Sequence, residues 1–169
     1  MSAAIRELRS SDLDRLLEIN QANTPEVGSV DCERLAFIFD EATIRRGVTV
    51  DDGLVGFTLV LGPSSAYDSV NYRWFQTNHP GSWYLDRVAI STGYRRRGLG
   101  TGLYENVFDA LGAARAGALG LEVNLEPPNP ASMAFHERLG FEYLAQETTD
   151  YGTVAMLLRT IQAGIASSS

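Results

Sequence analysis

The chain has 169 residues, of which 44% are hydrophobic and 21% are charged, a composition typical of one globular domain with a sizeable core. Its formal net charge of −7 argues against nucleic acid as a partner, since nucleic-acid binding needs a basic surface, and favours cationic partners such as amines. The single cysteine, Cys32, excludes an internal disulfide bond and predicts a cytoplasmic protein. No apolar run is long enough to span a membrane, and the first residues lack the apolar segment of a signal peptide.

The first third of the chain predicts short strands alternating with helices. A strand is expected at residues 5–8, followed by a helix that Ser10 or Ser11 would cap. Asp31 is the expected cap of a second helix. A hairpin should follow, with its turn at residues 51–53 between two apolar strands.

Residues 62–82 show no regular pattern and are expected to form a long irregular stretch. A long loop in a small domain is often functional. The tyrosine, tryptophan and arginine side chains of this stretch are suited either to lining a binding pocket or to a dimer interface, and the sequence leaves both readings open.

The second half predicts further alternation of strands and helices, and together the elements indicate a three-layer α/β fold. The expected elements are a strand at 83–90, a helix from about 99 to 116, a strand at 118–124, a helix at 129–139, and closing strands at 141–145 and 154–159.

The most informative segment is residues 95–102, Arg-Arg-Arg-Gly-Leu-Gly-Thr-Gly, between an expected strand and an expected helix. Such a turn at a helix start gathers unpaired backbone N–H groups and the positive end of the helix dipole, which suits a pyrophosphate. The glycines keep side chains away from the main chain, and the arginines add positive charge. The spacing is neither G-x-G-x-x-G nor that of a P-loop. The alternative is a plain tight turn.

A second motif follows the next strand. Residues 129–141 read Asn-Pro-Ala-Ser-Met-Ala-Phe-His-Glu-Arg-Leu-Gly-Phe. Together with the Arg-x-x-Gly-x-Gly pattern of residues 95–102, this segment resembles the GNAT superfamily of N-acetyltransferases, whose second motif has the form Asn-x-x-Ala/Ser-x-x-aromatic-Tyr-x-x-x-Gly-Phe. His136 stands where the family has tyrosine. Residues 122–130 are similar to those of a little-characterised bacterial branch of the family.

The resemblance implies acetyl-CoA as co-substrate and a twisted mixed sheet of about seven strands, whose two central parallel strands splay apart to admit the pantetheine arm. It also implies that the turn binds the pyrophosphate and that backbone groups of the preceding strand bind the pantetheine. The implied cofactor-binding residues are Val88, Ala89, Ile90, Arg95, Arg96, Arg97, Gly98, Leu99, Gly100, Thr101, Gly102, Asn129, Ser132 and Phe135.

Several of these residues also have a purely structural interpretation. Asn129 and Ser132 are typical of a helix start and could serve as caps alone. Phe135 and the strand residues 88–90 could belong to the core. The two histidines, His79 and His136, are far apart in sequence, so no metal site is expected.

Acetyl transfer to an amine needs a base, because an amine with a pKa of ~10.4 is mostly protonated at neutral pH. Glu122 is the first candidate, because it lies in an apolar strand and some ribosomal-protein N-acetyltransferases of the family place their base glutamate in a similar strand. The segment after Glu122 is longer here than in those proteins, so Glu126 and Asp86 remain alternatives. Glu122 could also face solvent or pair with Arg87.

His136 occupies the position of the tyrosine that protonates the departing thiolate in the family. A neutral imidazole can donate a proton, and its ordinary pKa of ~6.5 lies near working pH. A thiol near ~8.5 can also leave without a proton donor. The alternatives for His136 are a cofactor contact or a packed helix residue.

The predicted function is direct, sequential transfer of an acetyl group from acetyl-CoA to a primary amine of a small molecule or a peptide. The alternative is a non-catalytic acyl-CoA-binding sensor or partner-binding module, which the replaced tyrosine keeps open. Neither nucleic acid nor a membrane is an expected partner, and a homodimer stays open. The acetyltransferase domain is expected to span residues 1–160, with a frayed tail at 161–169.

Overall fold

The computed structural model describes residues 2–162, which form seven strands, five α-helices and two short 3₁₀-helices. In chain order the elements are β1 (Ala3–Glu7), η1 (Ser10–Asp12), α1 (Leu13–Ala22), α2 (Cys32–Glu41), β2 (Ile44–Val50), β3 (Gly53–Leu61), α3 (Val70–Asn78), β4 (Trp83–Ile90), η2 (Thr92–Tyr94), α4 (Leu99–Ala113), β5 (Ala118–Glu126), α5 (Pro130–Arg138), β6 (Glu142–Thr149) and β7 (Gly152–Thr160).

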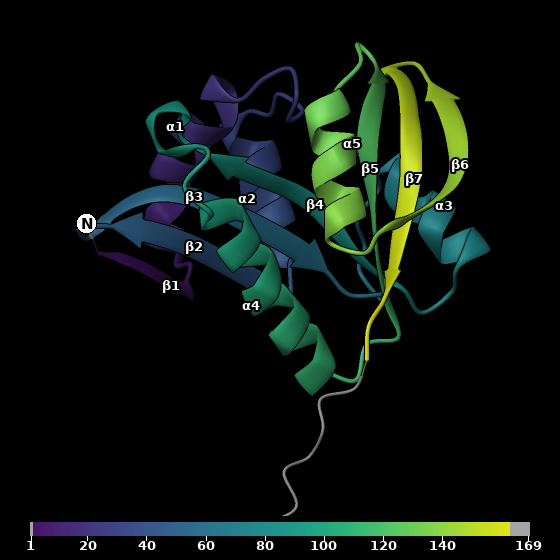
Figure 1. Ribbon diagram of the computed structural model, residues 1–169, viewed down its shortest axis with the longest axis horizontal. Helices are drawn as coiled ribbons and strands as arrows, with labels where there is room; N and C mark the ends of the chain where they lie inside the picture. Colours follow the sequence, from purple (N-terminus) through teal and green to yellow (C-terminus); the bar gives the residue numbers. More distant parts are fainter. Residues whose placement is uncertain (1, 163–169) are drawn as a thin grey trace, which may run out of the picture.

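The strands form one mixed sheet in the order β1-β2-β3-β4-β5-β7-β6 (Figure 1). Every neighbouring pair is antiparallel except β4 and β5, which are parallel and lie at the centre. The chain between them contains α4, which supplies the crossover that a parallel pair requires. The predicted three-layer α/β fold with a mixed seven-strand sheet is therefore confirmed.

Helices cover both faces of the sheet (Figure 1). The apolar side chains of the strands alternate between the cores on these two faces. On β3, Leu59 and Leu61 belong to the core that also contains residues of α1, α2 and α3, whereas Val60 belongs to the core that contains residues of α4. This alternation follows from the two-residue period of a strand. Every residue of β3 from Leu54 to Leu61 is buried, as expected for a strand covered on both faces.

The central parallel pair separates soon after it begins. β4 and β5 pair only at Trp83 with Leu119 and at Tyr84 with Gly120. Each strand continues for six more residues without ladder pairing to the other. The predicted splay of the two central strands is confirmed, and in this region each of them keeps a strand partner on one side only.

The prediction of an irregular stretch at residues 62–82 is wrong for the middle of that stretch, which forms α3. The Ser69 hydroxyl accepts a hydrogen bond from the Tyr72 amide at 3.4 Å and caps the helix start. Tyr72 and Phe75 are buried, and the other residues of α3 are exposed or half-buried. A nine-residue helix with so short a buried stripe gives a weak periodic signal in the sequence. Ser69 is the one residue that could have indicated it.

The α3 helix is fixed to the sheet by two contacts. A Cβ atom at Gly120 would lie 2.5 Å from Phe75 Cε1, so only a glycine in β5 leaves room for this ring. Trp74 Nε1 donates a hydrogen bond to Glu147 Oε1 of β6 at 3.0 Å. These contacts tie α3 to β5 and to the outer strand β6.

One of the two predicted helix caps is correct. The Asp31 carboxylate accepts a hydrogen bond from a main-chain amide of the first turn of α2 at 2.8 Å, as predicted. The prediction for the first helix is wrong, because Ser10 and Ser11 lie inside η1. There the Asp12 carboxylate accepts a hydrogen bond from the Arg9 amide at 2.8 Å, and α1 begins one residue later.

The other predicted elements are present, and their ends differ by a few residues. The first strand runs over Ala3–Glu7, the helix after the glycine-rich turn ends at Ala113, β5 extends to Glu126, and the last two strands run over Glu142–Thr149 and Gly152–Thr160.

The end of the described chain departs from the expected frayed tail. Ile161 is buried, and its amide donates a hydrogen bond to the Gly117 carbonyl at 2.9 Å. Residues 163–169 of that predicted tail lie outside the described residues. Within residues 2–162, no helix combines the length and the apolar character that crossing a membrane requires.

Candidate active site

The predicted phosphate turn connects β4 to α4, and no side chain caps this helix start. Gly98 is the N-cap residue and has a φ of 77°, a left-handed conformation that glycine adopts without strain. The first main-chain hydrogen bond into the helix runs from the Gly102 amide to the Gly98 carbonyl, at 3.1 Å. The amides of Leu99, Gly100 and Thr101 therefore precede any acceptor within the helix and lie at the positive end of its dipole, where anions bind.

The two predicted motifs meet in space at Gly100 and Phe135. A Cβ atom at Gly100 would lie 3.7 Å from Phe135 Cζ, so the first turn of α4 faces a side chain of α5. The half-buried Phe135 ring also meets the Tyr104 ring edge-on, with 5.6 Å between ring centroids. Because Gly100 has no side chain, only the Phe135 ring lies near the main chain of the helix start on this side.

The arginines of the turn are all exposed, and two of them make contacts that are well defined. The Arg95 guanidinium donates to Asn23 Oδ1 at the end of α1 and to the Ile90 carbonyl at 3.4 Å. The Arg97 guanidinium lies over the Tyr94 ring, 5.2 Å from its centroid. The turn is thereby tied to α1 on the other side of β4, and it keeps positive charge at the surface.

The predicted pantetheine-binding residues Val88, Ala89 and Ile90 lie on the part of β4 that has separated from β5. One edge of this segment pairs with β3. Among the described strands, none pairs with its other edge. Main-chain groups on that edge face the opening between the central strands, as the predicted contacts require.

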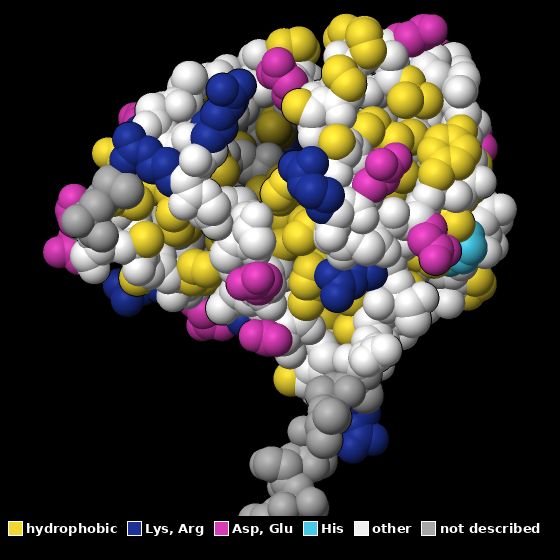
Figure 2. All heavy atoms as spheres, in the orientation of Figure 1, with side chains coloured by type: hydrophobic (Ala, Val, Ile, Leu, Met, Phe, Trp, Pro, Cys, Tyr) yellow, Lys and Arg dark blue, Asp and Glu magenta, His cyan; other side chains and the backbone are white. Residues whose placement is uncertain are grey.

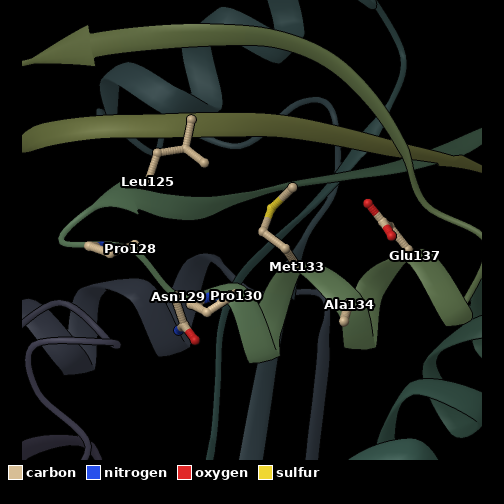
Figure 3. A pocket seen from close by; sticks show the side chains of 7 residues that line it. All are labelled: Leu125, Pro128, Asn129, Pro130, Met133, Ala134 and Glu137. Atoms are coloured by element: carbon tan, nitrogen blue, oxygen red, sulfur yellow. The ribbon is translucent and has the colours of Figure 1, made fainter.

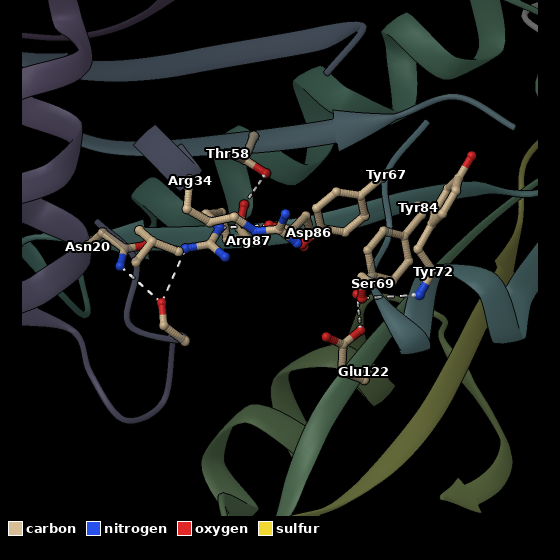
Figure 4. Close-up of polar contacts among 12 residues, drawn as sticks. Asn20, Arg34, Thr58, Tyr67, Ser69, Tyr72, Tyr84, Asp86, Arg87 and Glu122 are labelled. Carbon is tan, nitrogen blue, oxygen red and sulfur yellow. Dashed lines mark hydrogen bonds and ion pairs between the residues drawn. The ribbon is translucent and has the colours of Figure 1, made fainter. Parts of the chain in front are cut away.

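Glu122 lies on β5, two residues beyond the last position that pairs with β4. The Tyr84 hydroxyl donates a hydrogen bond to Glu122 Oε2 at 2.6 Å (Figure 4). The residue as a whole is half-buried, but protein surrounds its carboxyl, and this burial raises the pKa of the carboxyl from 4.5 to about 7. Hydrogen bonds from Tyr84 and Asn71 lower the pKa, and the charge of Asp86 raises it further. A carboxyl that exchanges its proton near neutral pH is suited to act as a general base.

Asp86 occupies the matching position on β4 but has other partners. Its carboxylate accepts a hydrogen bond from the Tyr67 hydroxyl and another from Arg87 Nε, both at 2.6 Å (Figure 4). The Asp86 and Arg87 side chains are 4% and 7% exposed, so the ion pair is buried. A bulge in β4 at Asp86 brings these consecutive residues together. Arg87 thus pairs with Asp86, and not with Glu122 as one alternative proposed.

Hydrogen bonds join the buried pair of Asp86 and Arg87 to α1 and to the segment that follows it. Arg87 Nη1 donates to Asn20 Oδ1 at 2.7 Å and to the Gly28 carbonyl at 3.2 Å. Sequence reasoning missed Asn20 and Tyr84 as members of the candidate site, whereas Tyr67 belongs to the stretch at 62–82 whose aromatic side chains were expected to line either a pocket or a dimer interface. The partners of Asn20 and Tyr84 come from distant parts of the chain, and no local pattern marks them.

The third candidate carboxylate, Glu126, lies exposed at the end of β5, where its Oε2 accepts from Thr153 Oγ1 at 3.5 Å. Of the three candidates, Glu122 lies at the opening and is held by the neutral groups of Tyr84 and Asn71. Within residues 2–162, no three His, Cys, Asp or Glu side chains are grouped so as to hold a metal ion.

His136 is buried between α4 and α5, with only 5% of its surface exposed. Its Nδ1 lies 2.7 Å from the Ser132 carbonyl, which can only accept, so Nδ1 carries the proton. Its Nε2 then accepts a hydrogen bond from the Tyr104 hydroxyl at 2.6 Å. Burial lowers the pKa of His136, which keeps the ring neutral. Both ring nitrogens are therefore engaged by protein groups.

Asn129 and Ser132 lie at the start of α5, where the structure shows capping. Asn129 Oδ1 accepts a hydrogen bond from the Ser132 amide at 3.3 Å. A hollow of about 340 Å³ lies beside this helix start (Figure 3). Asn129 is the only predicted site residue that lines it, and the full lining is Leu125, Pro128, Asn129, Pro130, Met133, Ala134 and Glu137.

The face of the molecule that carries α4 and α5 is hollowed between the connection before α4 and helix α5 (Figure 2). Hydrophobic side chains lie inside this hollow, and basic side chains lie beside it (Figure 2). A cleft of this kind suits a ligand with a charged end and an apolar arm.

A family model described as the acetyltransferase (GNAT) family matches residues 13–141. The match spans most of the chain, and the chain belongs to this family. A search of curated protein sequences gave no significant match.

Solved structures of other proteins share the fold over almost the whole chain. The ribosomal-protein-S18-alanine N-acetyltransferase from Escherichia coli is 20% identical, with 99% of each chain covered and a TM-score of 0.75. The protein yncA from Salmonella typhimurium, solved with its cofactor acetyl-CoA, is 18% identical, with 98% of each chain covered and a TM-score of 0.72. An Arabidopsis thaliana protein in complex with the bisubstrate analogue CoA-Ac-MVNAL is 15% identical, covering 94% of this chain and 99% of that chain, with a TM-score of 0.71.

The buried contact between α4 and α5 can be tested by removing one hydroxyl. Tyr104→Phe leaves His136 Nε2 buried without its donor, so we expect the free energy of unfolding to fall by about 1–3 kcal/mol. Urea unfolding measures the change. The control is Tyr143→Phe, at a side chain that is 56% exposed, which should stay within about 0.5 kcal/mol of the parent. Equal stability of Tyr104→Phe and the parent would contradict the contact.

Proposed function

We propose that this protein transfers an acetyl group from acetyl-CoA directly to a primary amine of a small molecule or a peptide. The observation that carries the proposal is the position of Glu122. The Glu122 carboxyl, with a pKa of about 7, lies on β5 at the opening between the two central strands. The start of α4, which no side chain caps, follows the other central strand, β4. The start of α4 can bind an anion, and the Glu122 carboxyl can accept a proton.

The residues present fit acetyl-CoA. The left-handed Gly98, the open main chain at Gly100 and the first amides of α4 suit its pyrophosphate. The unpaired edge of β4 suits the amide groups of its pantetheine arm. The proposed cofactor-binding residues are Val88, Ala89, Ile90, Arg95, Arg96, Arg97, Gly98, Leu99, Gly100, Thr101, Gly102, Asn129, Ser132 and Phe135.

Acetyl-CoA supplies an activated thioester, and the protein orients the amine and removes its proton. The amine nitrogen forms a bond to the acetyl carbon, and the carbon–sulfur bond breaks with its electron pair going to sulfur. The amine proton passes to Glu122. A base with a pKa of about 7 is well matched to this task at neutral pH, since about half of it is ionised there and it can still hold the proton.

Two of the similar structures support the class of acceptor. One is the ribosomal-protein-S18-alanine N-acetyltransferase, and the other is a complex with the bisubstrate analogue CoA-Ac-MVNAL. A suitable panel therefore combines peptides that begin with alanine or methionine with the small amines L-lysine, spermidine and 2-phenylethylamine. The lone cysteine supports the cytoplasm as the location. A homodimer stays a prediction.

Acetyl-CoA binding is expected to stabilise the fold through the phosphate turn. At about 100 times its dissociation constant, the ligand adds about 2.7 kcal/mol to the free energy of unfolding, which a melting curve detects. Gly100→Glu places a carboxylate in the proposed anion site and should abolish the shift, while the free protein stays folded because a Cβ atom at Gly100 meets only Phe135 Cζ, at 3.7 Å. Gly117→Glu, at an open position outside the site, should keep the shift. An undiminished shift in Gly100→Glu would exclude the proposed phosphate turn.

The role of Glu122 is tested by turnover. Glu122→Gln should lower kcat by about 100-fold or more and leave the affinity for acetyl-CoA nearly unchanged. In the parent protein, kcat/KM should rise with pH through about 7, because a base works only after it has lost its proton. This rise should disappear in Glu122→Gln. The matched changes Glu126→Gln and Asp86→Asn test the alternatives, and full activity of Glu122→Gln would pass the role to one of them or to water.

The proposal that His136 protonates the departing thiolate requires the ring to exchange one of its present partners. It predicts that His136→Phe lowers kcat and that His136→Tyr restores much of it, because a phenol can donate to the same atom. Equal kcat values for His136→Phe and the parent, measured well below the melting temperature, would leave His136 as a residue that joins α4 and α5. Tight acetyl-CoA binding without turnover on any amine would favour the non-catalytic alternative.

A further inference from the structure

A polar atom without a partner lies next to Glu122 on helix α3. Asn71 Oδ1 is buried and has no hydrogen-bond partner. The amide group of the same side chain lies close enough to the Glu122 carboxyl to lower its pKa. Most buried polar atoms in proteins have a partner, so a lone buried acceptor beside a candidate base suits a donor that arrives with a ligand.

The packing of α3 on β5 sets the position of Asn71. Phe75 packs against Gly120, and Asn71 precedes Phe75 by four residues, which places both on the same face of the helix. Glu122 follows Gly120 by two residues and lies on the same face of the strand. Four helical residues rise about 6 Å. Two strand residues rise about 6.6 Å. The two steps match, so the contact that seats Phe75 also holds Asn71 beside Glu122.

We propose that Asn71 positions the acceptor amine, with its Oδ1 accepting one N–H of a primary amine while the Glu122 carboxylate takes a proton from the same nitrogen. This inference rests on the proposed acetyl transfer and adds the residue that orients its acceptor. Asn71 belongs to α3, the element that sequence reasoning missed, and it comes from a different part of the chain than either predicted motif.

The chemistry of a primary amine explains why two acceptors are useful. A primary ammonium group has three N–H bonds, and loss of one proton to Glu122 leaves two N–H bonds and a lone pair. A hydrogen bond from one remaining N–H to Asn71 Oδ1 limits rotation about the nitrogen and directs the lone pair. The amide oxygen stays neutral throughout, so it holds the amine both before and after the proton has moved.

A buried acceptor that binds one N–H of a primary amine should disfavour an amine in which a methyl group replaces one hydrogen on the nitrogen. An N-methyl amine retains a single N–H after deprotonation, and its methyl group would meet either Asn71 or Glu122 in part of its orientations. Sites built to bond a polar group disfavour analogues that lack it, because the buried acceptor is then left unpaired.

The experiment compares the panel amine that has the highest kcat/KM with its N-methyl derivative. Asn71→Leu has a similar size but no acceptor, so we expect KM for the primary amine to rise about 10-fold or more and the preference over the N-methyl amine to shrink by a similar factor. Asn71→Asp keeps an acceptor oxygen at the same position and should retain the preference, although kcat should fall because a second carboxyl replaces the N–H group that faces Glu122. The affinity for acetyl-CoA should be unchanged in both variants. The matched control is Asn78→Leu on the same helix, where the exposed side chain bonds only the Trp74 carbonyl.

The outcomes separate this inference from the proposed function. If the parent acetylates the amine and Asn71→Leu keeps its KM and its preference, the inference is overturned and the acetyl transfer stands. If the parent acetylates none of the panel, the proposed function fails, and calorimetric binding of 2-phenylethylamine to the protein–CoA complex decides the inference. Weaker binding to Asn71→Leu than to Asn78→Leu would support it, and equal or absent binding would overturn it.

Discussion

Hydrogen bonding between β4 and β5 stops after two residue pairs, and the arrangement of the whole site depends on this interruption. The sheet tolerates it because each strand keeps an antiparallel neighbour, β3 on one side and β7 on the other. The interruption leaves main-chain groups of β4 without a strand partner in the middle of the molecule. It also gives Glu122 access to solvent from a strand that would otherwise lie inside a continuous sheet.

The carboxyl groups of Asp86 and Glu122 lie at the start of this opening and have different kinds of partner. Asp86 is buried with Arg87, whose positive charge offsets the cost of removing a carboxylate from water. Glu122 receives hydrogen bonds from the neutral groups of Tyr84 and Asn71, which compensate for only part of that cost. The remaining cost of removing the carboxylate from water raises the pKa of Glu122 to about 7. The same kind of side chain thus belongs to a buried ion pair at one position and has only neutral hydrogen-bond partners at the other.

The sequence predicted those parts of the site that depend on neighbouring residues. The turn at 95–102 and the helix start at Asn129 are local structures, in which glycine conformation and capping act over a few residues. Helix α3 was missed because its stability comes from contacts with β5 and β6, which are distant in sequence. The position of His136 on its helix was predicted, but its contact with Tyr104 depends on how α4 packs against α5.

Along the chain, the α3 helix belongs to the connection between β3 and β4, which are antiparallel neighbours in the sheet. Such strands can be joined by a turn of a few residues, so the segment at 62–82 can lengthen, shorten or change its sequence without altering the order or direction of any strand. The turn before α4 belongs to a different connection and is unaffected by such changes. Selection can therefore act on one connection independently of the other. The sequence of the connection at 62–82 can therefore vary while the strands that border the central opening keep their order and direction.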